Sequence, residues 1–144
     1  MTTVWTIGYE SLWPDALVAE LSAAGVERVL DVRYRPQSRR PGMSKTKLGL
    51  KLAEHGISYE HRRELGTPVD IRGLFRSGHL DEARAAYREH AVAHAGESLD
   101  ALAAELPRVR TALLCLEANP AGCHRRLVAE LLAERLPSLV VEDL

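Results

Sequence analysis

The chain has 144 residues, of which 46% are hydrophobic and 27% charged, so it can bury a core of its own, and we expect one domain over residues 1–144. Its net charge of −1 excludes a protein coated with positive charge, and no apolar run approaches the roughly 20 residues that cross a bilayer. The first residues lack the basic and apolar regions of a signal peptide, so we expect a cytoplasmic protein whose two cysteines are thiols.

The first half of the chain alternates short apolar runs with helical patterns, which is typical of α/β domains. The apolar runs predict strands at residues 4–7, 29–32 and 57–61. Helix-start and helix-stop residues predict one helix from Pro14 to the C-cap Gly25 and another from the N-cap Ser44 to about Glu54. Between the second strand and the second helix, prolines and a glycine predict a loop.

The second half begins with an irregular segment and then returns to the same alternation. Frequent glycine and a proline predict a long surface loop over residues 62–80. Three helices are then predicted, one capped by Asp81, one capped by Ser98 and one opened by Asn119 and Pro120. Strands are predicted at residues 111–116 and 140–141. We therefore expect an α/β fold with three layers, in which a mostly parallel sheet of four to five strands is flanked by helices.

Basic residues are concentrated in one segment. Residues 28–47 hold seven basic residues and one acidic residue, a net charge of +6, which leaves −7 on the rest of the chain. Arginine dominates the segment that follows the second strand, and the guanidinium group suits bidentate binding of phosphate or carboxylate. A solvated charged face is the alternative interpretation. The predicted anion-binding residues are Arg33, Arg35, Ser38, Arg39 and Arg125.

Cysteine, histidine and glutamate cluster after the strand predicted at residues 111–116. A helix opened by Asn119 and Pro120 would place Cys123 in its first turn, where the helix dipole favours a thiolate. His124 could then act as acid or base. The alternative is that both cysteines are structural. The predicted catalytic residues are Cys123, His124 and Glu117, and the other predicted pocket residues are Tyr9, Asp31 and Cys115.

Metal binding is the less favoured interpretation of the same residues. The residues of zinc-ligand types are Cys115, Glu117, Cys123 and His124. However, neighbouring residues on a helix, such as Cys123 and His124, point about 100° apart, and the spacing Cys-x7-Cys is not that of a standard zinc knuckle. His90 and His94 share a helical face, yet a solvated pair explains their spacing. We therefore expect neither a metal nor another cofactor.

Charged segments at the carboxyl ends of several predicted strands indicate one binding pocket. We expect it to bind a phosphate-bearing small molecule, such as a nucleotide, or a nucleic acid, and the chain could be a Cys/His-dependent enzyme. The alternative is a non-enzymatic module that binds nucleic acid or protein and whose cysteines are structural. No membrane partner is expected, and the sequence indicates no oligomeric state.

Four motifs in order resemble the domain-of-unknown-function family numbered 488. The motifs are Thr6–Glu10, Asp31–Arg33 with the Pro36 to Gly42 segment, Tyr59 with Glu64–Gly66, and Leu114–Arg125. The resemblance implies an intracellular, mainly prokaryotic α/β protein, and the family has no defining activity. Met43 and Thr67 depart from the residues that members often carry, but neither lies in the Cys-His-Arg segment.

Overall fold

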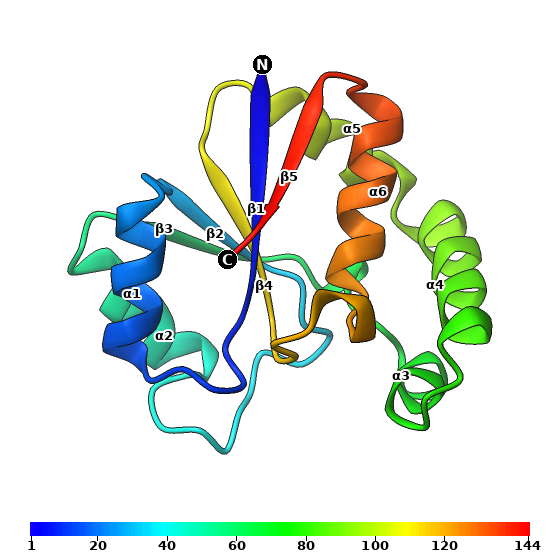
Figure 1. The fold of residues 1–144 in the computed structure, drawn as a ribbon, viewed down its shortest axis with the longest axis horizontal. Helices are drawn as coiled ribbons and strands as arrows, with labels where there is room; N and C mark the ends of the chain where they lie inside the picture. Colours follow the sequence, from blue (N-terminus) through cyan, green and yellow to red (C-terminus); the bar gives the residue numbers. More distant parts are fainter.

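Five parallel strands form one sheet in the order β3-β2-β4-β1-β5 in the computed structural model, which describes residues 1–144 (Figure 1). The strands are β1 (Thr2–Gly8), β2 (Arg28–Asp31), β3 (Ser58–His61), β4 (Thr111–Cys115) and β5 (Leu139–Asp143). The α-helices are α1 (Pro14–Ala23), α2 (Lys45–Ala53), α3 (Val69–Arg76), α4 (Leu80–His94), α5 (Gly96–Glu105) and α6 (Arg125–Arg135). The 3-10 helices are η1 (Arg63–Leu65) and η2 (Pro120–Gly122). The expected α/β class with a parallel sheet is confirmed.

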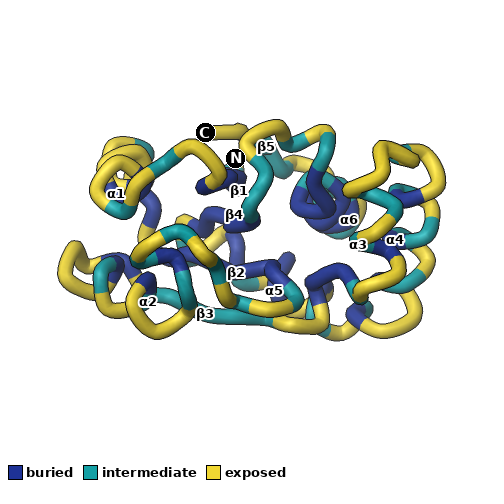
Figure 2. Tube along the Cα trace, turned by 90° about the horizontal axis from the view of Figure 1, so that it is seen from below, coloured by how far each residue is buried: buried dark blue, intermediate teal, exposed yellow.

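Helices cover both faces of the sheet. On one face α1 and α2 pack against the strands through residues such as Leu17, Leu21 and Leu48. On the other face α3 to α6 contribute a second apolar cluster that includes Tyr87, Leu102 and Leu131. Viewed from below, the buried central strands lie between these two layers (Figure 2). The three expected layers follow from strands that are apolar on both faces.

The topology opens a crevice between β1 and β4. These two strands are neighbours, but the helix that follows β1 packs on one face of the sheet and the helix that follows β4 packs on the other. Their connections therefore diverge at the carboxyl edge, and ligands bind at such divergence points in open parallel sheets. None of the helices combines the length and apolar character that a membrane crossing needs.

The strand ends differ from the sequence prediction by one or two residues. For residues 62–80, by contrast, the predicted type of structure is wrong. This segment is not a loop, because η1 and α3 occupy most of it. Pro68 stands at the N-cap of α3, Gly73 lies inside the helix, and Gly78 follows its end with φ 81°. The packing of Ile71 into the apolar cluster outweighs the weak helix propensity of Gly73.

The segment after β4 also differs from the prediction. Asn119 does act as a cap, since its side chain accepts a hydrogen bond from the Ala121 amide, but it caps only the short helix η2. Cys123 then takes an extended conformation, with φ −132° and ψ 143°, and α6 begins at Arg125. Cys123 therefore lies before the long helix and not in its first turn.

Candidate functional site

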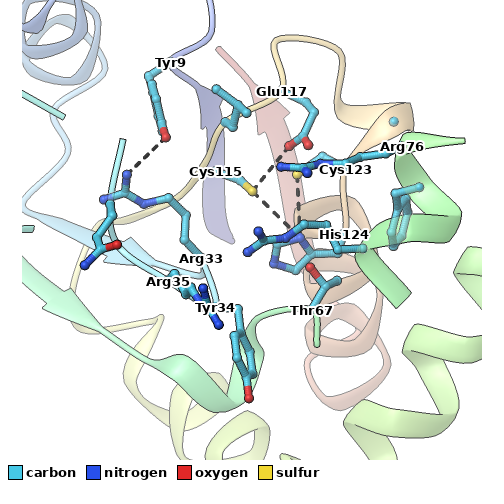
Figure 3. Close-up of a pocket in the computed structure, with 15 residues that line it drawn as sticks. Tyr9, Arg33, Tyr34, Arg35, Thr67, Arg76, Cys115, Glu117, Cys123 and His124 are labelled. Carbon is cyan, nitrogen blue, oxygen red and sulfur yellow. Dashed lines mark hydrogen bonds between the residues drawn. The ribbon is translucent and has the colours of Figure 1, made fainter. Parts of the chain in front are cut away.

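A cavity of about 240 Å³ lies at the carboxyl edge of the sheet (Figure 3). Its wall comes from the segments that follow β1, β2 and β4 and from α3. The lining residues used below are Tyr9, Arg33, Tyr34, Arg35, Thr67, Arg72, Phe75, Arg76, Cys115, Glu117, Cys123 and His124. The sheet edge predicted from the sequence is thus the one that carries the cavity.

Two thiols and one imidazole meet in this cavity. The Cys115 Sγ lies 3.8 Å from the Nδ1 of His124, and the Cys123 Sγ lies 3.9 Å from the same nitrogen. Figure 3 shows the three side chains pointing toward one another. Glu117 places a carboxylate oxygen 3.5 Å from the Cys115 Sγ. The structure therefore brings together the three predicted catalytic residues and Cys115.

The orientation of His124 is fixed from two sides. Its Nε2 lies 2.6 Å from the carbonyl oxygen of Val32, so Nε2 carries the hydrogen and donates it. The ring also packs against Tyr87, with centroids 5.3 Å apart. When the imidazole is neutral, it consequently presents the lone pair of Nδ1 to both sulfur atoms.

Burial sets the protonation of this group. It raises the pKa of the Cys123 thiol well above its ordinary value, because a charged thiolate loses its hydration there. Burial by itself lowers the pKa of His124, but the pKa is raised overall, because hydrogen bonding and negative charge at Cys123, the Val32 carbonyl and the charge of Glu117 favour the imidazolium. Cys123 lies before α6 and not in its first turn, yet the backbone amide of Arg125, which opens the helix, still donates to its Sγ at 3.5 Å. Burial outweighs this contact, so the pKa of the thiol is raised and not lowered as the sequence predicts.

Arg33 and Asp31 form a buried ion pair beside the cavity. Asp31 accepts hydrogen bonds from the Arg33 side chain at 2.7, 2.9 and 3.1 Å, and Tyr59 donates a further one at 2.5 Å. The remaining Arg33 nitrogen donates to the Tyr9 hydroxyl and to the Met43 carbonyl. These contacts occupy the guanidinium, so Arg33 ties the segments after β1 and β2 together.

Three other arginines on the cavity wall have no carboxylate partner. Arg35 comes from the loop after β2, whereas Arg72 and Arg76 lie one turn apart on α3. None of the ion pairs in the chain includes them. Glu117 is the only acidic residue on the wall. The cavity therefore carries an excess of positive charge.

Three predicted anion-binding residues lie outside this cavity. Ser38 and Arg39 line a neighbouring open depression together with Lys45 and Lys47. The Arg125 guanidinium is fully buried and donates to the carbonyl oxygens of Glu117 and Ala118. Arg125 therefore holds the loop after β4 in place, and of the predicted arginines only Arg33 and Arg35 line the cavity.

Arg72, Phe75 and Arg76 are wall residues that the sequence reasoning missed, because their segment was predicted as a loop. A signal for the helix was present. Ile71, Leu74 and Phe75 are spaced as one apolar helical face, and Arg72 and Arg76 share another face at i and i+4.

The family comparison agrees with this architecture. Residues 14–132 match the protein family described as "Domain of unknown function DUF488". The matched range contains β2, β4, the Cys-Cys-His group and the arginines of the cavity. No curated protein and no solved structure matches the chain.

Proposed function

Because the chain belongs to the DUF488 family, whose description assigns no activity, we propose its function from the cavity: it binds the phosphate group of a small ligand such as a nucleotide or a nucleic-acid end. The observation that carries this proposal is that Arg35, Arg72 and Arg76 line the cavity and none of them is paired with a carboxylate. Guanidinium groups that the protein leaves unpaired in a concave site are well suited to binding an anion.

The size of the cavity favours a small ligand. Its volume of about 240 Å³ is below the roughly 300–1,000 Å³ typical of sites for drug-sized molecules. A phosphate with a small organic group fits such a space better than a dinucleotide. Phe75 and Tyr34 offer aromatic surface beside it, although one face of the Tyr34 ring already contacts Arg63, at 4.3 Å.

Both cysteines are free, which supports a reducing compartment such as the cytoplasm.

Removing the two helical arginines should weaken binding of inorganic phosphate and of a nucleoside monophosphate by at least about 100-fold, since each charge-assisted hydrogen bond contributes about 1.5–3 kcal/mol. The variant is Arg72→Gln with Arg76→Gln, and isothermal titration calorimetry measures the affinity. The helix α3 packs through Ile71, so the free energy of unfolding of the protein should not change. Arg108→Gln is the matched control, because Arg108 lies just before β4, at the amino edge of the sheet and away from the cavity.

A further variant shows whether phosphate binds in the cavity or in the neighbouring basic depression lined by Arg39. Arg39→Gln alters the neighbouring depression and should leave phosphate affinity unchanged. An equal loss in Arg39→Gln and in the double variant would contradict the proposal. A nucleic-acid module that used the whole basic loop would instead bind oligonucleotides with an affinity that falls steeply between 50 and 200 mM salt.

The reactive role predicted for Cys123 has its own test. Because burial raises the pKa of the Cys123 thiol, the thiolate fraction at pH 7 is smaller than in an unfolded chain, and it grows as the pH rises. We therefore expect iodoacetamide to label Cys123 in the metal-free native protein at least about 10-fold more slowly than in the denatured protein at pH 7. Fast labelling that levels off below about pH 8.5 would instead establish an activated nucleophile, as the sequence predicts. Peptide mass spectrometry separates Cys123 from Cys115.

A further inference from the structure

The group formed by Cys115, Cys123 and His124 has the composition and geometry of a metal site. Their three ligand atoms all lie within 4.8 Å of one another, and all three residues are buried. We propose that they bind one transition-metal ion of the zinc class through two thiolates and the Nδ1 of His124. This inference does not depend on the phosphate site proposed above.

The distances are close to those that a tetrahedral ion requires. Bonds of about 2.3 Å to sulfur and about 2.0–2.1 Å to nitrogen place ligand atoms about 3.5 Å (S to N) and about 3.8 Å (S to S) apart. The observed Sγ to Nδ1 separations are 3.8 and 3.9 Å. The two sulfur atoms lie within 4.8 Å of each other, so no pair of ligand atoms has to approach by more than about 1 Å to close around an ion.

The surroundings of His124 are those of a prepared ligand. Metal-binding histidines nearly always donate their second ring hydrogen to a carbonyl or carboxylate, which fixes the tautomer. Here Nε2 donates to the Val32 carbonyl at 2.6 Å, and the Tyr87 ring limits rotation of the imidazole. Nδ1 is thus left free to face the sulfur atoms.

The objection that came from the sequence does not apply to this fold. Cys123 and His124 would diverge if both were helical, but Cys123 is extended and His124 has φ −65° and ψ −17°. Their side chains consequently reach the same point (Figure 3). Cys115 arrives there from the end of β4, so the loop of residues 116–122 brings the two cysteines together.

Charge and ligand type indicate the class of ion. Two thiolates neutralise a divalent ion, so binding adds no net charge to a buried group near several arginines. Soft sulfur ligands favour zinc or cobalt over magnesium and calcium. All three ligands also line the cavity, so the fourth coordination position faces it, as in zinc sites that keep one position open. Glu117, 3.5 Å from the Cys115 Sγ, stands beside that position.

Cobalt substitution in the full-length, untagged protein tests the proposal. Chelator-treated protein should bind one equivalent of Co²⁺, develop a thiolate-to-cobalt charge-transfer band, and release about two thiol protons per ion at neutral pH. Zn²⁺ should displace the cobalt and block alkylation of both cysteines. Cobalt binding without a charge-transfer band, or alkylation that zinc does not slow, would overturn the proposal. This experiment uses the unaltered protein and so does not depend on the folding of a variant.

Variants then assign the ligands. Cys115→Ser and His124→Gln should each weaken Co²⁺ affinity by more than about 100-fold, since replacing a group that only hydrogen-bonds a metal ligand already lowers metal affinity about 10–100-fold. His90→Gln is the control, because His90 and His94, with ring centroids 4.8 Å apart, are a histidine pair that could hold an ion elsewhere on the chain. An affinity loss confined to His90→Gln would refute the Cys-Cys-His assignment.

Discussion

Replacing Asp31 with alanine is expected to lower the free energy of unfolding by about 3–5 kcal/mol, because it leaves the buried Arg33 guanidinium without its counter-charge. Asp31 is fully buried and Arg33 is 5% exposed, so water cannot take over the lost interaction. The change also removes the acceptor of the Tyr59 hydroxyl. Denaturant unfolding followed by circular dichroism measures the difference.

Two comparisons isolate the cause of that loss. Asp15→Ala breaks an ion pair with Lys51 in which the Asp15 side chain is 88% exposed, and it should lower the stability far less than Asp31→Ala, because solvent screens exposed pairs. The double variant Asp31→Ala with Arg33→Met removes both charges, and it should be more stable than Asp31→Ala alone. If the double variant is the less stable of the two, an unpaired buried charge is not what destabilises the single variant.

This ion pair shows what the sequence could and could not reveal about the site. Asp31 and Arg33 are two residues apart on an extended segment, so their side chains point to the same face, and a pairing was open to inference. The spacing of residues in the sequence could not show that Arg33 also donates hydrogen bonds to the Tyr9 hydroxyl and the Met43 carbonyl, because these contacts join segments that are distant in the chain. Arg33 therefore looked like an available anion ligand.

The strands β1, β2 and β4 were predictable because each is a short, mainly apolar run, too short for a helix, with turn or helix-start residues on its flanks. The helix α3 was not predicted, since Pro68 and Gly73 are helix-breaking residues, and their presence outweighed the short apolar face of Ile71, Leu74 and Phe75 in the sequence interpretation. The position of Cys123 was likewise decided by tertiary contacts. Arg125 binds the carbonyl oxygens of Glu117 and Ala118, which folds the loop back and delays the start of α6.

Gly8→Ala is expected to destabilise the protein by about 3 kcal/mol and to disrupt the candidate site. Gly8 ends β1 opposite Cys115 of β4, and an added Cβ would stand 1.7 Å from the carbonyl oxygen of Glu117. That oxygen belongs to the backbone and also accepts a hydrogen bond from Arg125, so it cannot move aside cheaply. The loop after β4 must shift instead, carrying Glu117 away from the Cys115 thiol.

Gly73→Ala is the matched control, because a Cβ at this position in α3 meets no atom within 4 Å. It should stabilise the protein by about 0.5–1 kcal/mol, the usual gain when alanine replaces glycine inside a helix. Thermal unfolding measures both variants, and alkylation of Cys115 reports on the site. In Gly8→Ala the labelling at pH 7 should be faster than in the wild type, since the displaced loop exposes the thiol. Wild-type stability and wild-type labelling in Gly8→Ala would mean that the contact between Gly8 and Glu117 does not hold the site together.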